Sequence, residues 1–465
     1  MSEKTSNPSE KSSSTGAHGK DRVEPRKLKG FRDYSPEIMA ERMRILDIMR
    51  DEAQRAGFQQ IATPALEYLD TLLGQGEDTE KEMYRFVDHG GRHVGLRFDL
   101  TVPFARYVAE HQGSMVFPFK RLQVGEVWRG ENPQKGRFRE FVQSDLDIIG
   151  VDSIQADVEV LTTLHRILAR LNIGPFTMLV GNRPVLSAMI RKVMTYLAPE
   201  QEQKAIIAID KLNKIGPAKV EAMLAALPGG SSEQAASLMK MFTTKAACGD
   251  TDFKQLEPLF RGDEAAMKAI KRFHDTVVLY RQATKGLAGQ SRVDLAVARG
   301  LGYYTGVVFE AVVDELPGFG SISGGGRYDD LVSRFIDRQL QGVGGTIGLD
   351  RIVALQEERR ALASSHCRTV FVACAGDDAA AYAWELTVTL RDAGVSCDIA
   401  LSTGKVGNQF RHASRLGYPF VLMVGGDEVV SRTFSIKNMA TSDEKKGLAA
   451  AQVLTVVQDA LKNLA

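Results

Sequence analysis

Cysteine and long apolar runs are both scarce in this chain of 465 residues. Its four cysteines, at positions 248, 367, 374 and 397, show no C-x-x-C spacing, and its eight histidines are scattered. This pattern predicts neither a disulfide framework nor a zinc site, and we expect no metal to be held by side chains. No run approaches the ~18 apolar residues that cross a bilayer, so we expect no membrane partner.

An excess of charge of one sign is also lacking. The chain has 59 basic and 58 acidic residues, a net charge of +1, which excludes a generally basic protein but leaves room for a local patch that binds nucleic acid. With 44% hydrophobic and 25% charged residues, the length predicts two or three domains with ample core. Residues 1–25 are polar, so we expect a disordered tail rather than a secretory signal, and a cytoplasmic protein.

The hydrophobic pattern changes along the chain. Residues 26–355 mix strands and helices and are interrupted by a helical insertion at about 185–290. A polar linker follows at 356–366, and 367–465 alternate between strand and helix, which predicts a small α/β domain with a parallel or mixed sheet. Within the first region we expect strands at 94–98, 176–181, 293–298 and 305–313, and helices at 37–56, 154–171, 264–284 and from about 327.

Residues 129–147 are the most informative stretch, because they predict two strands joined by a charged loop. The second strand carries polar residues at alternate positions, namely Arg137, Arg139, Gln143, Asp145 and Asp147. A strand's period of two places them on one face, and buried charges are costly unless they are paired or meet a ligand. Arginine suits phosphate, whereas Gln and Asp suit an amine or a ring N–H. The alternative is the solvated face of an ordinary hairpin.

Four further segments carry groups of the same kinds. They contain Asp99 and Thr101, then Arg299 with Tyr303 and Tyr304, then three glycines at 324–326 after a strand, and last Arg351 at the start of a helix. Each has an ordinary structural alternative, such as a helix capped by Thr101 or a bulge at a glycine. Five such segments in one chain together favour a site for phosphate and an amine.

On these segments the chain resembles the histidyl-tRNA synthetases, a family of class II aminoacyl-tRNA synthetases, from about residue 26 to the C-terminus. Pro64 lies in what resembles the first class motif, at the family's dimer interface. Residues 121–150 resemble the second motif and Gly348–Arg351 the third. The segments Arg299–Glu310 and Gly324–Asp329 resemble the two that are peculiar to the histidine enzymes.

The resemblance implies a fold and a set of partners. We expect an α+β catalytic domain, with an antiparallel sheet of six or more strands flanked by helices, and a C-terminal α/β domain that resembles an anticodon-binding module. The implied partners are L-histidine, ATP with Mg²⁺ as a substrate complex, histidine tRNA and a second copy of the chain. No organic cofactor is implied.

The resemblance also implies roles for residues that match the family's motifs. Arg129 would hold the α-phosphate of ATP, Glu131 would lie near the adenine, Arg351 would bind the γ-phosphate and Arg137 a further phosphate oxygen. The α-amino group of histidine would meet Asp99, Thr101 and Gln143. Asp147 and Tyr304 would bind the imidazole, with Tyr303 beside them. Arg299 would lie against the carboxylate and the α-phosphate, and would be catalytic together with Arg129.

Contacts to tRNA are implied at two places. These are Gln134, Lys135 and Arg137 in the hairpin loop, and Lys405, Asn408 and Arg411 in the C-terminal domain. For the latter three, the alternative is a solvated helix face.

Three positions depart from the usual family pattern. Gly302 stands where an Asp is usual, Asp147 where many bacterial members have Glu, and Asp350 where Glu is common. None of the three removes a phosphate-binding arginine.

Two rival functions fit the same fold. A paralogue is a histidine-sensing regulatory subunit of ATP phosphoribosyltransferase, which normally lacks the C-terminal domain and has usually lost ATP-binding arginines. The retained Arg129 and Arg351, and the module at 367–465, favour the synthetase. A synthetase for another amino acid is disfavoured by Tyr303 and Tyr304 with the glycine segment at 324–329.

Overall fold

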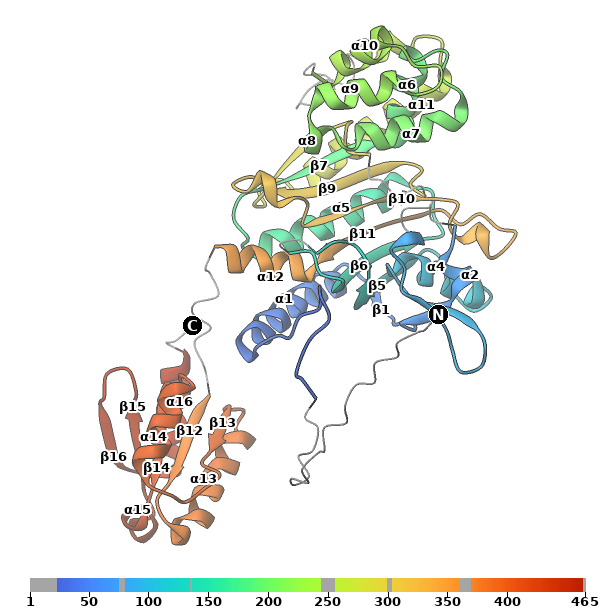
Figure 1. The fold of residues 1–465 in the computed structure, drawn as a ribbon. Helices are drawn as coiled ribbons and strands as arrows, with labels where there is room; N and C mark the ends of the chain where they lie inside the picture. The colour runs from blue at the N-terminus through green and yellow to red at the C-terminus, as the bar shows by residue number, and fades with distance from the viewer. Residues whose placement is uncertain are drawn as a thin grey trace, which may run out of the picture. The chain divides into compact units, whose positions relative to one another are not determined.

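The computed structural model describes residues 23–74, 80–133, 136–243, 256–298, 303–359 and 369–462. The chain divides into two compact units, Met1–Glu358 and Arg359–Ala465, which are described separately (Figure 1). Most of the expected tail at 1–25 and of the linker at 356–366 lies outside the described residues. Within the described ranges, no helix combines the length and the apolar character needed to cross a membrane.

The first unit is built on an eight-stranded sheet in the order β1-β5-β6-β11-β10-β9-β7-β8. Its six inner strands pair antiparallel, which confirms the expected sheet of six or more strands. They are β5 (Phe119–Trp128), β6 (Glu140–Ile149), β11 (Gly342–Gly348), β10 (Ser323–Tyr328), β9 (Val307–Val313) and β7 (Phe176–Asn182). The edge strands β1 (Gln59–Gln60) and β8 (Gln290–Val293) pair parallel, since long crossover connections join them to their neighbours.

Helices cover one face of this sheet. They are α1 (Pro36–Arg55), α5 (Ile154–Arg170) and α12 (Leu349–Glu358), and Figure 1 shows them together along β6 and β11. Leu146 and Ile148 of β6 pack into the same core as Met49 of α1 and Leu164 of α5. Because side chains alternate along a strand, the other face of β6 is left for the polar residues at 143, 145 and 147.

A second, three-stranded sheet lies beside α2 (Leu69–Leu72) and α4 (Thr101–His111). Its strands are β2 (Leu66–Tyr68), β4 (His93–Leu96) and β3 (Arg85–Val87). The alternative in which Thr101 caps α4 is wrong. The preceding residue, Leu100, occupies the cap position, and the Asp99 carboxylate accepts the Val102 N–H at 3.0 Å, because it lies three residues upstream and can reach that donor.

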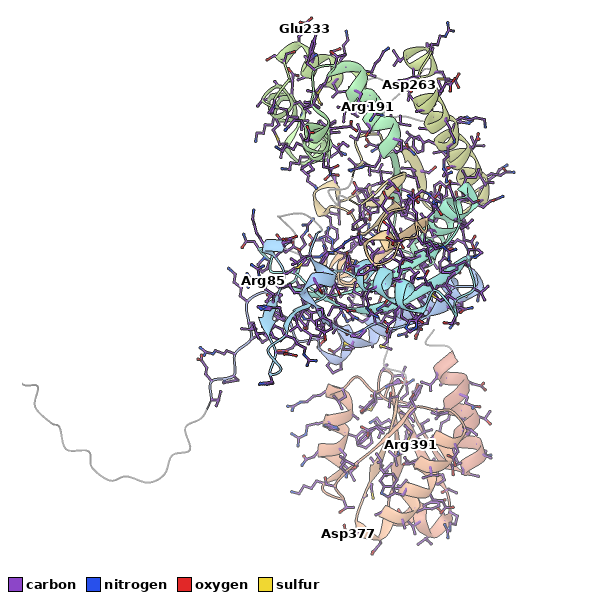
Figure 2. All side chains as sticks on the ribbon, turned by 90° about the vertical axis from the view of Figure 1, so that its right-hand side faces the viewer. Arg85, Arg191, Glu233, Asp263, Asp377 and Arg391 are labelled. Carbon is purple, nitrogen blue, oxygen red and sulfur yellow. The ribbon has the colours of Figure 1, made fainter. Side chains whose placement is uncertain are left out.

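A helical insertion joins β7 to β8 and forms the green end of the molecule in Figure 1. Its helices are α6 (Arg183–Val193), α7 (Pro199–Ile209), α8 (Leu212–Ile215), α9 (Pro217–Ala225), α10 (Ser232–Thr243), η2 (Glu257–Phe260) and α11 (Glu264–Ala283). Figure 2 shows Arg191, Glu233 and Asp263 spread over these helices. Gly229 lies in the turn between α9 and α10, where its φ of +83° and its contact with the Tyr196 carbonyl leave no room for a side chain.

The glycines at 324–326 correct the sequence prediction. They were expected to follow a strand and precede a helix, but they lie inside β10. A Cβ on Gly325 would be 2.1 Å from the Gly344 carbonyl oxygen, and one on Gly326 would be 2.7 Å from the Tyr304 ring. Close packing therefore requires these glycines, and only a short 3-10 turn, η4 (Val332–Arg334), follows in place of the expected helix. The strand expected at 293–298 lies earlier, as β8.

The second unit contains a five-stranded sheet in the order β13-β12-β14-β15-β16. The strands β13 (Cys397–Ile399), β12 (Val370–Cys374) and β14 (Phe420–Val424) are parallel, as the α/β alternation predicts. The hairpin of β15 (Phe434–Asn438) and β16 (Glu444–Leu448) is antiparallel, so the sheet is mixed, one of the two alternatives that the sequence predicts. The helices are α13 (Ala380–Asp392), α14 (Val406–Arg415), α15 (Gly426–Ser431) and α16 (Ala450–Lys462).

Candidate active site

A polar cavity of about 310 Å³ opens over the sheet, and the cavity face of β6 forms its floor. Gln143, Asp145 and Asp147 all line it and are all buried. The alternation seen in the sequence is therefore realised in β6, whereas Arg137 and Arg139 lie before the strand begins.

Asp147 is fixed from three sides. The hydroxyl of Tyr328 donates to its Oδ1 at 2.5 Å, and Nη2 of Arg121 lies 3.2 Å from its Oδ2. Gly344 pairs with Asp147 across the ladder, and a Cβ there would come within 1.9 Å of Oδ1. Burial raises the pKa of Asp147, and Arg121 and the Tyr328 hydrogen bond oppose that rise. Only glycine at 344 thus leaves space for this carboxylate.

Arg121 is a fully buried cation beneath the cavity. The exposed fraction of its side chain is 0%. Its Nη2 donates to the Leu100 carbonyl at 2.9 Å, and its guanidinium lies 4.4 Å from the centre of the Phe104 ring. It is shared between two acids, because Nη1 is 3.9 Å from Oδ2 of Asp145 while Nη2 approaches Asp147. The pKa of Asp145 is raised to about 7, because burial and the neighbouring Asp147 raise it and Arg121 only partly opposes them.

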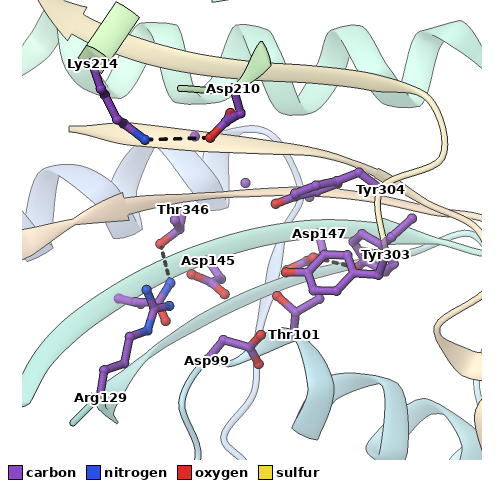
Figure 3. Close-up of a pocket in the computed structure, with 15 residues that line it drawn as sticks. Asp99, Thr101, Arg129, Asp145, Asp147, Asp210, Lys214, Tyr303, Tyr304 and Thr346 are labelled. Carbon is purple, nitrogen blue, oxygen red and sulfur yellow. Dashed lines mark hydrogen bonds and ion pairs between the residues drawn. The ribbon is translucent and has the colours of Figure 1, made fainter. Parts of the chain in front are cut away.

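Asp99 and Arg129 face each other across the near side of the cavity (Figure 3). Nε of Arg129 donates to the Phe98 carbonyl at 2.9 Å, and its guanidinium lies 5.2 Å from the Phe141 ring centre, which fixes the side chain at the end of β5. Burial raises the pKa of Asp99, whereas the hydrogen bond from the Val102 N–H and the charge of Arg129 lower it. Thr101, the first residue of α4, lines the same cavity.

Aromatic rings form the far wall. Tyr303 and Tyr304 precede β9, with ring centres 4.8 Å apart, and the Tyr303 ring meets Tyr328 edge-on at 6.2 Å. Above them, the insertion contributes Asp210 and Lys214, an ion pair at 3.7 Å that also lines the cavity (Figure 3). The cavity is therefore closed by aromatic rings on one side and by the helical insertion above.

A second cavity of about 180 Å³ adjoins the first. Its lining includes the four residues expected to bind ATP, which are Arg129, Glu131, Arg137 and Arg351. The Arg351 guanidinium lies 4.4 Å from the Phe319 ring centre, and its Nε donates to the Ser321 carbonyl at 3.3 Å. The pKa of Arg351 is lowered to about 10, first by burial and then by the like charge of Arg137. Two cations that disfavour each other in a cavity make a site for an anion.

The two cavities share a wall. Arg129, Gln143, Gly324 and Thr346 line both, and Nε2 of Gln143 donates to the Thr346 hydroxyl at 3.3 Å. A ligand in the acidic cavity and one in the basic cavity would therefore meet beside Arg129.

The chain matches known proteins over almost its whole length. A family model described as histidyl-tRNA synthetase matches residues 30–352, and one described as anticodon binding domain matches residues 369–460. The chain is 37% identical over 431 residues to the histidine–tRNA ligase of Rhodopirellula baltica, covering 91% of this chain and 95% of the relative. It is 36% identical over 445 residues to that of Wolinella succinogenes, covering 93% and 98%.

The chain belongs to the histidyl-tRNA synthetase family.

Solved structures agree with this membership. The histidyl-tRNA synthetase of Nostoc covers 94% of this chain and all of its own, with a TM-score of 0.82 and 27% identity. A second structure, from Bacillus halodurans, is described as an ATP phosphoribosyltransferase regulatory subunit/histidyl-tRNA synthetase. It covers 86% of this chain and 98% of its own, with a TM-score of 0.72. Because the two sequences are only 23% identical, this match shows likeness of fold alone.

For this family member, the structure brings together most of the residues predicted for the site. Asp99, Thr101, Arg129, Gln143, Asp147, Tyr303 and Tyr304 line the first cavity, and the four ATP residues line the second. Arg299, Gly302, Gln134 and Lys135 lie outside the described residues. The remaining candidates for tRNA contacts, Lys405, Asn408 and Arg411, are exposed at the start of α14 in the other unit.

Several lining residues were missed by the sequence prediction. Asp145 could have been predicted as a site residue, since it lies on the same strand face as Gln143 and Asp147. Arg121 pairs with Asp147 across the hairpin, so register counted back from the loop would have found it. Tyr328 and Thr346 come from β10 and β11, and Asp210 and Lys214 from the insertion. Only the assembled fold brings these four residues to the cavity.

Asp350, which stands where Glu is common, holds the surrounding structure together. Its Oδ1 accepts from the Tyr34 hydroxyl at 2.6 Å and from Arg42, and its Oδ2 accepts the Val142 N–H at 2.8 Å. It therefore ties the N-terminal segment and α1 to β6, immediately before Arg351.

Proposed function

We propose that this protein is a histidine–tRNA ligase, which activates L-histidine with ATP and transfers the histidyl group to the 3′ end of histidine tRNA. The curated relatives over 91–93% of the chain support this function. The observation that carries it here is the shared wall, which makes an acidic cavity and a cationic cavity meet at Arg129.

In the first step, a carboxylate oxygen of histidine attacks the α-phosphorus of ATP. A new O–P bond forms, the bond from the α-phosphorus to the bridging oxygen breaks, and pyrophosphate leaves with the electron pair. Arg129 neutralises charge that develops on the α-phosphate, and Arg299 is proposed to assist between carboxylate and phosphate. Bringing both substrates together supplies much of the acceleration.

The first cavity holds histidine in this proposal. Asp99, Thr101 and Gln143 bind the α-ammonium group, while Asp147, held by Tyr328, accepts an imidazole N–H. Tyr304, with Tyr303 beside it, binds the other side of the ring. A pocket built to hydrogen-bond the ligand's polar groups rejects analogues that lack them by roughly 10⁴–10⁵.

The second cavity holds MgATP. Arg351 binds the γ-phosphate and Arg137 a further phosphate oxygen, which relieves the repulsion between the two cations. Glu131 lies beside the adenine. The ordering of Arg351 on Phe319 leaves its guanidinium fixed before ATP arrives.

In the second step, a terminal ribose hydroxyl of the tRNA attacks the carbonyl carbon of histidyl-adenylate. AMP leaves with the bonding electron pair, and the hydroxyl proton is released. The hairpin loop residues Gln134, Lys135 and Arg137 are proposed to meet the tRNA. Lys405, Asn408 and Arg411, exposed on α14, are proposed to contact it at a second place.

The domain limits follow from the same assignment. We place the catalytic domain at 26–355, the linker at 356–366 and the anticodon-binding domain at 367–465. The division of the chain between Glu358 and Arg359 supports these limits.

A homodimer is supported by an exposed apolar surface on the three-stranded sheet. Tyr68 of β2 and Phe86 of β3 both pair with Val94 of β4, so they lie on the same face, and they are 55% and 49% exposed. Val87, on the other face of β3, is 56% exposed. Exposed apolar side chains of this size are typical of an interaction surface. Pro64 immediately precedes β2, at the motif assigned to the dimer interface.

Histidine-dependent exchange of pyrophosphate into ATP, without tRNA, tests the proposed function. The wild type should exchange, and Arg129→Ala and Arg299→Ala should each lose ~100-fold or more, the typical effect of removing a group that stabilises transition-state charge. Arg44→Ala, which removes an exposed arginine paired with Glu41 on α1, is the matched control and should retain exchange. Histidine binding without exchange in the wild type would instead support the regulatory subunit.

A further inference from the structure

Four oxygens in the first cavity accept no hydrogen bond of good geometry from the described residues, although Nη2 of Arg121 makes an ion pair at 3.2 Å with one of them, Oδ2 of Asp147. They are Oδ2 of Asp99, Oε1 of Gln143, Oδ1 of Asp145 and Oδ2 of Asp147, and all four belong to buried side chains. Buried polar atoms are nearly always hydrogen-bonded, so a group of four in one cavity indicates a ligand that brings donors. Three of these side chains were already assigned to histidine, and Asp145 was not.

The number of donors on histidine matches this set. Its α-ammonium group has three N–H bonds, and a neutral imidazole has one. Asp147 lies against the tyrosines, where it takes the ring N–H, and this leaves the three ammonium donors for Asp99, Gln143 and Asp145. Without Asp145, one ammonium N–H would have no acceptor among these four oxygens.

The position of Asp145 fits an acceptor in the middle of the site. It lies between Gln143 and Asp147 on the same face of β6 and opposite Thr346 on β11 (Figure 3). The strand rise separates Gln143 from Asp147 by ~13 Å, so a ligand between them passes over Asp145. Arg121 neutralises the negative charge of Asp145 only in part, because the nearest nitrogen of Arg121 is 3.9 Å from Asp145 and Arg121 lies closer to Asp147.

We propose that Asp145 is a specificity-determining residue of the histidine site, whose Oδ1 accepts a hydrogen bond from the α-ammonium group of the bound amino acid. The inference rests on the proposed function and deepens it. Asp99 and Gln143 accept the other two ammonium hydrogens, and the Thr101 hydroxyl on the same cavity wall shares one of them. The ammonium charge also completes the neutralisation that Arg121 begins.

The charges around Asp145 explain why an ammonium ligand suits it. Arg121 on β5 and Asp147 on β6 face it, Asp99 lies across the cavity before α4, and the Thr346 hydroxyl on β11 interacts with it. Burial holds the pKa of Asp145 near 7, so the empty site retains a proton there for part of the time at neutral pH. A bound cation favours the ionised form and expels that proton.

Asp145→Asn tests the proposal with two ligands. Calorimetry would give the Kd of histidine and of its deamino analogue 3-(imidazol-4-yl)propionate, for both proteins. The wild type should prefer histidine. The variant keeps an amide oxygen that can accept but loses the carboxylate charge and gains an N–H donor, so it should lose ~10-fold of that preference, the effect of weakening one charge-assisted hydrogen bond. A variant that weakens both ligands by the same factor would show a structural role and overturn the proposal.

Asp157→Asn is the matched control. Asp157 is also a buried carboxylate whose pKa burial raises, but it lies on α5, bound to Arg327 and away from the cavity lining. Its replacement should leave the preference for histidine over the analogue unchanged. An equal loss of preference in this control would contradict the proposal that Asp145 binds the α-ammonium group.

A measurement on the wild type alone covers the case in which the variant fails to fold. Titrations at pH 7 in two buffers of different ionisation enthalpy give the protons released on binding. The protons given up by each free ligand's own imidazole are subtracted first, because the ammonium group lowers the imidazole pKa of histidine relative to that of the analogue. After this subtraction, histidine should release more protons than the deamino analogue, since only histidine carries the ammonium group. Equal release would contradict the proposal. A wild type that binds no histidine would instead contradict the proposed function.

Discussion

Gly344→Ala tests how the histidine cavity is built. A Cβ at position 344 would lie 1.9 Å from Oδ1 and 2.5 Å from Cγ of Asp147, far below contact distance. The backbone of β11 is held by ladders to β6 and β10, so the carboxylate must move instead. It would then lose its place opposite the imidazole and its hydrogen bond from Tyr328.

The magnitude follows from the interaction that is lost. One hydrogen bond to a charged group contributes about 1.5–3 kcal/mol, which corresponds to roughly 10- to 150-fold in affinity. We therefore expect the KM for histidine in pyrophosphate exchange to rise by ~10- to 150-fold. The KM for ATP should stay nearly constant, because Gly344 does not line the second cavity.

Gly345→Ala is the matched control on the same strand. The backbone of Gly345 also borders the first cavity, but its Cβ would point to the other face, 2.6 Å from Leu164 and 2.9 Å from Phe309, and so would crowd the core. It should lower thermal stability by an overpacking cost of about 1–3 kcal/mol while changing the KM for histidine little. An unchanged KM for histidine in Gly344→Ala, with folding confirmed by thermal melting, would refute the role given to this glycine.

Further predictions concern the other groups of the site. Arg351→Ala should raise the KM for ATP by ~10-fold or more with little change in the Kd of histidine measured by calorimetry. Tyr328→Phe should weaken histidine binding several-fold, because Asp147 loses the donor that orients it. The pKa of Asp145 is raised on folding to about 7, so its burial should make the empty protein progressively less stable as the pH rises from about 4 to 7. Asp145→Asn should remove that part of the decline in melting temperature. Lys405→Ala and Arg411→Ala should raise the KM for tRNA in aminoacylation and leave pyrophosphate exchange unchanged.

The sequence predicted those parts of the site that depend on local pattern. Gln143 and Asp147 could be placed on one face because a strand alternates with a period of two. Arg351 could be placed at a helix start because glycines precede a helical pattern. Arg299 was predicted from its motif, and it lies outside the described residues.

What could not be predicted depends on contacts between distant segments. Tyr328 reaches Asp147 only because β10 and β6 both border β11. The glycines at 324–326 suggest a turn when read locally, whereas the neighbouring strands and the Tyr304 ring require them inside β10. Lys214 reaches the cavity from the helical insertion. The strand pattern of the sequence does not predict where that insertion packs.

The central claim is that the two cavities are two halves of one adenylating site that meet at Arg129. A stable histidyl-sulfamoyl adenosine, which joins the two substrates as the adenylate does, tests it most directly by calorimetry and competition. The account predicts that this compound binds far more tightly than histidine or ATP alone, that it competes with both, and that Gly344→Ala and Arg351→Ala each weaken it. A compound that competes with only one substrate, or binds no better than that substrate alone, would contradict the account.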